Sequence, residues 1–109
     1  MSKPVLYVVK SIVSSEYAEE FNEWYHKKHM PKVIERSGCK TARRFKAIES
    51  EDKFMFMAVY EFADLESYLK YQNSQGKKEL LLDFAQNFGD RAAEFKRELR
   101  RSVWEQIYP

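Results

Sequence analysis

Hydrophobic residues fill a short segment near the beginning of the chain, residues 5–13, and many of them are β-branched. A run of this length and composition is typical of a strand that is covered on both faces. Apolar residues then recur at helical spacing, at Tyr17, Phe21 and Trp24, after a pair of serines suited to cap a helix. The pattern therefore predicts a buried strand followed by an amphipathic helix.

Pro31 interrupts this helical pattern. Because proline has no N–H group and its ring clashes with the preceding turn, we expect the helix to kink or restart there. At about 100° per residue, Met30, Val33 and Ile34 point well away from the preceding apolar stripe. Gly38 then ends the segment, because glycine readily takes the left-handed conformation at a helix C-terminus.

The middle of the chain has the pattern of a β-hairpin. Residues 41–48 alternate in polarity, which predicts a strand with one solvated face. Residues 49–52 form a polar turn, and residues 54–62 are apolar on both faces almost to their end. Asp64 can then cap a second helix that continues through Gln72.

The last third of the chain is less regular. Gly76 interrupts the second helix, and a further apolar stripe follows at helical spacing over residues 80–88. Residues 103–108 have the composition of a strand. The order is thus β-α-β-β-α-β, which predicts an α+β, ferredoxin-like fold: an antiparallel sheet with the helices on one face.

This plan places the first and third strands at the centre of the sheet. Those are the two strands that are apolar on both faces, so the side of the sheet away from the helices would expose valine, phenylalanine and methionine side chains. Such a patch is too large for a monomer. We therefore expect a homodimer through the open sheet face, with two sheets closing into an α+β barrel.

The 109 residues have the length of a single domain, residues 1–109, and 44% of them are hydrophobic, which is enough to fill a core. A formal net charge of +2 is too small to indicate a nucleic-acid partner by itself. The lone Cys39 cannot form an internal disulfide, which suits a reducing compartment. The sequence shows neither a signal peptide nor the roughly 20 apolar residues of a membrane span, so we expect a cytoplasmic protein without a membrane partner.

Motifs spread along nearly the whole chain are informative together: Trp24-Tyr25, His29-Met30-Pro31, Gly38, Ala42-Arg43-Arg44-Phe45, and Tyr68 with Tyr71. With them the chain resembles the dimeric α+β barrel superfamily and, within it, the EthD-like and related small families. The resemblance implies two protomers whose sheets close into one barrel. It also implies a pocket in each protomer, between the sheet and the helices.

Members of that superfamily include isomerases, polyketide cyclases, cofactor-free monooxygenases and haem-degrading enzymes. In several of them a histidine of the first helix, in a His-x-Pro-like setting, acts on the substrate, and His29 matches that histidine. The cyclases and monooxygenases use further histidines or a tryptophan on strands, whereas the predicted strands here contain no histidine. The resemblance therefore implies an architecture and leaves the reaction open.

His29 is the leading catalytic candidate, because it lies beside the helix break and an unperturbed histidine has a pKa of about 6.5. It can act as general base or acid, or it can instead bind the carbonyl groups freed by the proline. Tyr25 and Arg43 are candidates to stabilise a developing oxyanion, and Arg43 is preferred to Arg44 because it shares a face with Phe45. The alternatives are simple packing for the tyrosine and a salt bridge for the arginine.

Trp24, His26, Phe56 and Tyr60 are candidates to bind a substrate, and the aromatic residues among them would suit a flat aromatic ligand. They can equally belong to the core or to the dimer interface. His26 and His29 lie three residues apart, but a metal site needs at least one further ligand. We therefore expect no metal and no other cofactor.

Three classes of function remain. A cofactor-free enzyme would isomerise, cyclise or cleave a small aromatic or lactone-like carbonyl compound, with His29 as its general base. A non-catalytic homodimer would use the pocket for binding or fill it with side chains, and the lack of an acidic pair favours this reading. RNA binding comes third: the same element order builds the RNA-recognition module, yet residues 53–56 match its aromatic stacking segment only weakly.

Overall fold

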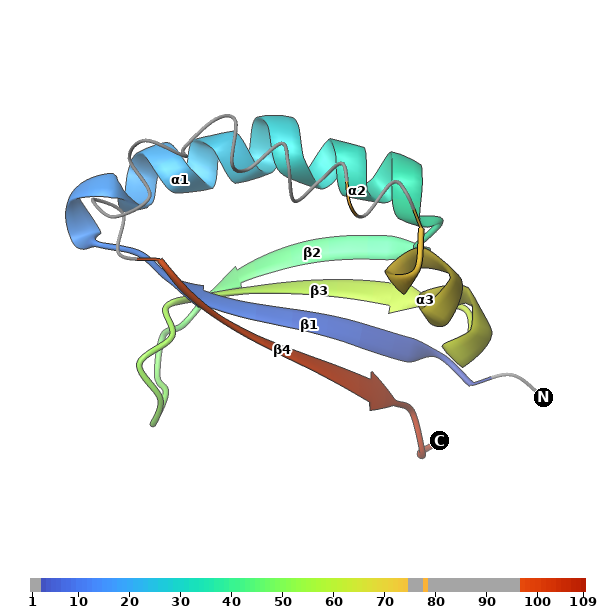
Figure 1. The fold of residues 1–109 in the computed structure, drawn as a ribbon. Helices are drawn as coiled ribbons and strands as arrows, with labels where there is room; N and C mark the ends of the chain where they lie inside the picture. Colours follow the sequence, from blue (N-terminus) through green and yellow to red (C-terminus); the bar gives the residue numbers. More distant parts are fainter. Residues whose placement is uncertain (1–2, 75–77, 79–96) are drawn as a thin grey trace.

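The computed structural model describes residues 3–74, 78 and 97–109, and its elements follow the predicted order (Figure 1). A short 3₁₀ turn, Ser15–Tyr17, precedes the first helix. The strands and α-helices are β1 (Val5–Ile12), α1 (Ala18–Trp24), α2 (Met30–Ser37), β2 (Thr41–Lys46), β3 (Phe56–Phe62), α3 (Leu65–Gln72) and β4 (Glu98–Glu105). The predicted apolar stripe over residues 80–88 lies outside the described residues.

The four strands form one antiparallel sheet in the order β2-β3-β1-β4, so the prediction of β1 and β3 as the central strands is confirmed. In this register Tyr7 of β1 lies opposite Tyr60 of β3, and Val9 lies opposite Ala58. Directly paired residues share a face of the sheet. The register therefore brings two tyrosines together on the side that the helices cover.

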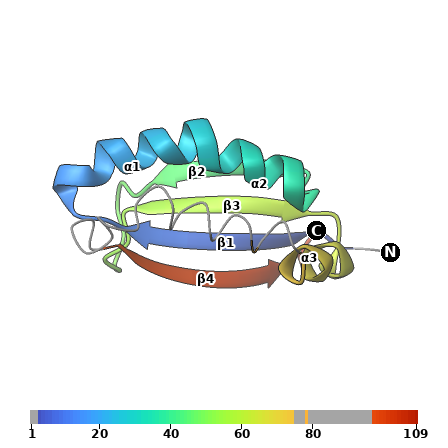
Figure 2. The ribbon, with the colours of Figure 1, turned by 45° about the horizontal axis from the view of Figure 1, so that its top comes forward.

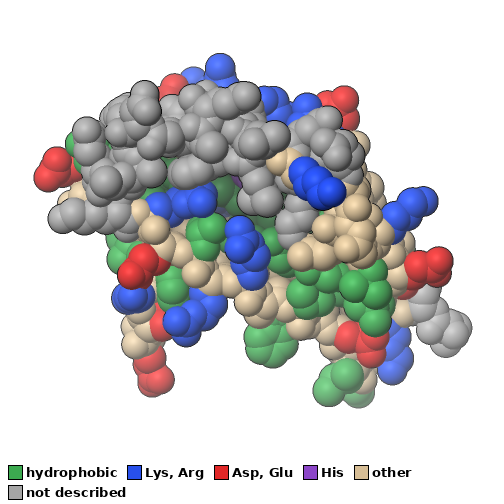
Figure 3. All heavy atoms as spheres, viewed as in Figure 1, with side chains coloured by type: hydrophobic (Ala, Val, Ile, Leu, Met, Phe, Trp, Pro, Cys, Tyr) green, Lys and Arg blue, Asp and Glu red, His purple; other side chains and the backbone are tan. Residues whose placement is uncertain are grey.

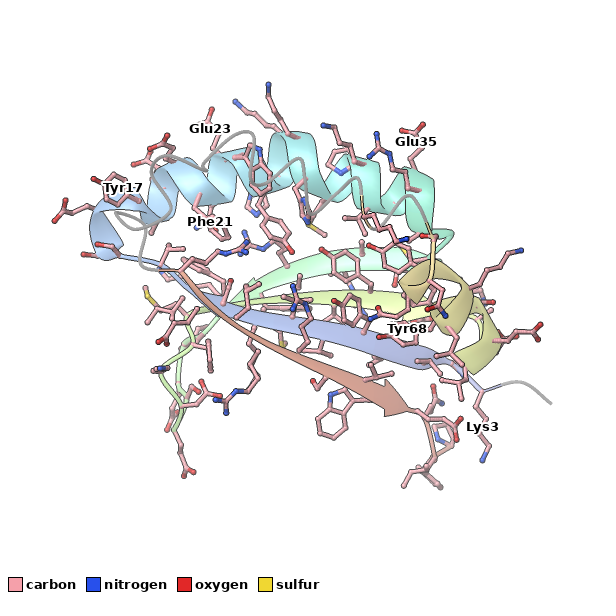
Figure 4. The ribbon with its side chains drawn as sticks, in the orientation of Figure 1. Lys3, Tyr17, Phe21, Glu23, Glu35 and Tyr68 are labelled. Carbon is pink, nitrogen blue, oxygen red and sulfur yellow. The ribbon has the colours of Figure 1, made fainter. Side chains whose placement is uncertain are left out.

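Helices α1 and α2 run as one long rod across a single face of the sheet, and α3 packs near the end of the same face (Figures 1 and 2). Phe21 points from α1 toward the sheet, whereas Glu23 and Glu35 point away from it (Figure 4). The largest fully buried side chains are Tyr60, Phe21, Phe62 and Val5. The core thus lies between the helices and the central strands.

The interruption of the long helix differs from the prediction. Between α1 and α2 lies a π-helical turn, Tyr25–His29, in which the Met30 N–H donates to the Tyr25 carbonyl five residues earlier. This wider turn changes the angular position of everything that follows, because it holds one more residue than an α-turn. Met30 and Val33 are therefore buried with the first stripe, and the prediction that they point away from it was wrong.

The remaining boundaries are close to those predicted. Gly38 ends α2 with a φ of 73°, and the Asp64 side chain caps α3 by accepting a bond of 2.8 Å from the Ser67 N–H, as expected. The hairpin strands are shorter than predicted, and β4 begins five residues earlier than residue 103. No helix among the described residues is long and apolar enough to cross a membrane.

Candidate functional site

Two tyrosine hydroxyls meet beneath the π turn. Tyr25, the first residue of that turn, and Tyr60, in the middle of β3, place their oxygens 2.9 Å apart. Both side chains are buried, with 6% and 2% of their surface exposed. Burial raises the pKa of each phenol, because the charged phenolate loses its hydration. Both groups thus stay protonated near neutral pH and act as hydrogen-bond donors or acceptors.

Arg44 covers this pair from the edge strand β2. Its guanidinium carbon lies 4.1 Å from the centre of the Tyr25 ring, and 5.3 Å from that of Phe56. Burial lowers the pKa of Arg44, but an arginine remains a cation at neutral pH. The arrangement is a cation–π contact at the border of the core.

The Arg44 Nη1 atom also connects β2 to the helix above. It donates a hydrogen bond of 2.7 Å to Asn22 Oδ1 and lies 3.2 Å from His26 Nε2. Because a guanidinium can only donate, His26 Nε2 must accept and carry no proton. The pKa of His26 is accordingly lowered, first by burial and then by repulsion from Arg44. His26 therefore holds the arginine in place as a neutral side chain.

The prediction that Arg43 faces the site was wrong. Arg43 is exposed on the opposite face of the sheet, where its guanidinium lies 5.9 Å from the centre of the Phe45 ring. The sequence favoured Arg43 because it shares a face with Phe45, and an apolar residue normally marks the buried face of an edge strand. Here 44% of Phe45 is exposed, and its neighbour Arg44 takes the buried side.

His29, the last residue of the π turn, packs between two aromatic rings. Its ring stacks on Trp24 with 4.9 Å between centres, and it meets Tyr25 edge-on at 4.7 Å. The half-buried histidine thus lies against the ring of the hydroxyl-bearing tyrosine. Of the predicted site residues, the structure brings these together around Tyr25: Trp24, His26, His29, Phe56 and Tyr60.

The sequence favoured Arg43 over Arg44, and it gave no indication that Tyr7 and Arg97 lie near the tyrosine pair. Tyr7 packs on Tyr60 with ring centres 5.9 Å apart, and on Tyr68 at 5.4 Å. Arg97, just before β4, is half-buried, which lowers its pKa to about 10. The pairing of the two central strands could have indicated Tyr7, because this pairing places Tyr7 opposite Tyr60. Arg97 lies in a run of mixed charge, residues 96–101, and such a run gives no sign in the sequence of a partly buried position.

One cavity of about 190 Å³ lies beside the hairpin and includes Phe45, Asp52 and Met57 in its lining. Its rim carries the salt bridge of 2.8 Å between Lys10 and Asp52. Within the described ranges, no three histidine, cysteine or acidic side chains gather as metal ligands. Among the described residues, the polar groups gathered around Tyr25 are a phenol, two imidazoles and a guanidinium.

Residues 4–102 match the sequence profile of a domain of unknown function, DUF4286. The chain belongs to this family. A search of curated protein sequences finds no match.

Solved structures with the same fold include proteins from three bacteria. An ethyl tert-butyl ether D (EthD) family protein from Bacillus halodurans has a TM-score of 0.68 at 18% identity, over 94% of this chain and 99% of the other. HapK from Hahella chejuensis also reaches 0.68, at 11% identity over 96% and 94%. A DABB family protein with a ferredoxin-like fold, from Mesorhizobium loti, reaches 0.61 at 12% identity over 97% and 99%. At these identities the likeness shows the fold, and it confirms the predicted ferredoxin-like, EthD-like architecture.

Proposed function

We propose that this member of DUF4286 is a small-molecule-binding protein that works as a cofactor-free acid–base enzyme. Its substrate would be a small aromatic or lactone-like carbonyl compound, which it isomerises, cyclises or cleaves. The observation that carries the proposal is the buried Tyr25–Tyr60 hydroxyl pair, held at 2.9 Å beside the ring of His29. The structural likeness to EthD family proteins agrees with it at the level of the fold.

The proposed chemistry is proton abstraction next to a carbonyl group. His29 takes the proton from carbon, the carbonyl oxygen gains the negative charge, and a tyrosine hydroxyl donates a hydrogen bond to it. The same imidazolium then returns the proton to another carbon, which completes an isomerisation without an oxidant or reductant. Both phenols suit the donor role, because their raised pKa keeps them protonated.

The test is turnover of a panel of lactones, phenolic ketones and aromatic carbonyl compounds, followed by NMR in deuterated buffer. We expect His29→Ala to lower kcat by about 10²–10⁴-fold, and Tyr60→Phe to lower it by about 10²-fold. Lys28→Ala is the matched control, since Lys28 is exposed in the same π turn. Circular dichroism verifies folding. Equal turnover and equal deuterium exchange in the wild type and His29→Ala would refute the role of the histidine.

A second candidate is a non-catalytic homodimer, favoured by the side of the sheet that the helices leave open. Leu6 of β1 lies opposite Trp104 of β4 on that side, and Met57 of β3 lies opposite Phe45 of β2. Trp104 has 60% of its surface exposed. We propose that a second copy of the chain covers this face in either case, so dimerisation alone does not separate the two functions.

A further inference from the structure

The Arg44 guanidinium uses only one of its two hydrogen-bonding edges within the described part of the chain. Both of its hydrogen bonds there, to Asn22 and His26, leave from Nη1. The buried Nε donates to no acceptor among the described residues. In a guanidinium, Nε–H and one Nη2–H point the same way and form the fork that binds a carboxylate through two parallel bonds.

Arg44 also has no carboxylate counter-charge among the described residues. Its hydrogen-bond partners there, Asn22 and His26, are neutral, and the other contacts of its guanidinium are with aromatic rings. Removing a cation from water without pairing it costs free energy. An anionic ligand would supply the missing charge, and would be held more strongly than on an exposed arginine because water competes less.

The tyrosine pair provides a further donor, and the Arg44 guanidinium lies over the ring of Tyr25 in that pair. Two hydroxyls carry two protons, and the bond between Tyr25 and Tyr60 uses only one of them. The second proton is directed to no other acceptor among the described residues. A ligand oxygen that accepts it would complete the hydrogen bonding of the pair, whichever tyrosine is the donor.

The surroundings carry further positive charge. Besides Arg44, both Arg97 and Arg101 lie near enough to Tyr25 to favour its phenolate form, and they oppose the rise in its pKa that burial causes. These two arginines come from the opposite edge of the sheet, at and before β4. On the face that looks toward the viewer in Figure 3, Lys and Arg side chains lie among hydrophobic ones, together with some Asp and Glu side chains. The local potential therefore favours an anion beside aromatic surface.

We propose that the Nε–Nη2 edge of Arg44 forms a subsite for the carboxylate of an aromatic acid, beside the Tyr25–Tyr60 pair, whose free proton serves the carbonyl oxygen of the same substrate. The inference rests on the proposed function and deepens it, because it names the anionic group of the substrate. The aromatic part is specified by the rings of Tyr25 and Phe56, against which the guanidinium lies. A flat ligand whose carboxylate binds the fork would stack along the same surface.

Calorimetry on the full chain with benzoate, phenylacetate and salicylate tests the subsite, with benzamide and acetate as comparison ligands. We expect at least one aromatic acid to bind the wild type and Arg43→Met alike, and Arg44→Met about ten- to a hundredfold more weakly. Benzamide, which lacks the charge, should bind weakly to all three proteins. Arg43 is the matched control, because it is the neighbouring arginine on the other face.

A direct readout does not depend on the folding of any variant. In the wild type, a bound aromatic acid should move the NMR resonance of the Arg44 Nε–H and slow its exchange with water. Equal affinity for benzamide and benzoate, binding by acetate alone, or an unmoved Nε–H resonance with all three acids would overturn the subsite.

The subsite and the proposed function can fail separately. If the subsite is overturned, loss of turnover of neutral carbonyl compounds in His29→Ala would still support the proposed function. Conversely, binding of an aromatic acid together with unchanged turnover in His29→Ala would contradict the proposed enzymatic function and support the subsite.

Discussion

His26 and Arg44 share a contact in which only one charge state of the histidine fits. The 3.2 Å approach of Arg44 Nη1 to His26 Nε2 requires the neutral ring, which lowers the pKa of His26. Protonation is therefore easier in the unfolded chain than in the folded one. Stability from this contact is fully present above the unfolded pKa of about 6.5, and it is lost as the pH falls below that value.

We predict that Arg44→Met raises the pKa of His26 toward 6.5 without restoring it completely, because burial is the larger of its two causes. An NMR titration of the His26 ring protons, assigned with a His26→Gln variant, measures the shift. Arg43→Met should leave the titration unchanged, since Arg43 lies on the opposite face. A pKa that moves equally in both variants would show that the two arginines act only through their overall charge.

The residues of the site could be predicted from sequence only in part. Tyr25 and His29 stood out because they shortly precede a proline in an amphipathic helix, and the strand position of Tyr60 followed from its apolar neighbours. The alternation of β2 places Arg43 and Arg44 on opposite faces, but the apolar Phe45 favoured the wrong one of the two as the residue that faces the helices. Only the packing of the guanidinium on Tyr25 decides that, and this contact joins residues far apart in the chain.

The π turn is the element that sequence periodicity could not predict. Counting at 100° per residue assumes an unbroken α-helix, so it separated Met30 from Phe21, although both are buried. The end of the same helix was predictable, because Gly38 has a local chemical reason to stand there. Its φ of 73° belongs to the left-handed region, which residues with a Cβ atom occupy at a cost.

We predict that Gly38→Ala lowers the free energy of unfolding by about 1–2 kcal/mol, and that Gly38→Asn lowers it by less, because asparagine tolerates this conformation better. No atom lies within 4 Å of the added Cβ, so the cost is one of backbone conformation and not of a clash. Urea denaturation of the three proteins measures it. An alanine variant as stable as the wild type would mean that the helix end adjusts to a right-handed conformation.

At the scale of the whole molecule, the order of elements and the double-sided strands were enough to predict the sheet. The topology β2-β3-β1-β4 follows because the two most apolar strands take the central places. The sequence pattern is less decisive about what covers the face of the sheet that the helices leave open. Its apolar side chains are interspersed with charged ones such as Lys10 and Arg100, which lie opposite each other.

We predict that the protein is a dimer in solution and that Phe45→Glu makes it monomeric, because a charge would be buried between the two sheets. Leu69→Glu is the matched control: Leu69 is 46% exposed on α3, close to the 44% of Phe45 on the open face. Light scattering after size-exclusion chromatography gives the mass of each. A monomeric wild type, or equal dissociation in both variants, would contradict the proposed interface.

The five-residue π turn also bears on how the family is to be aligned. Because it holds one residue more than an α-turn, it has the form of a one-residue insertion that the helix absorbed without rotating its second half out of the core. A homologue with one residue fewer between Trp24 and Met30 would run as an uninterrupted α-helix and keep both ends buried. Such a gap would fall within the turn that ends at His29, so it would change which residue lies against Tyr25. Homologues divided by this single gap should therefore also differ in whether they retain the histidine.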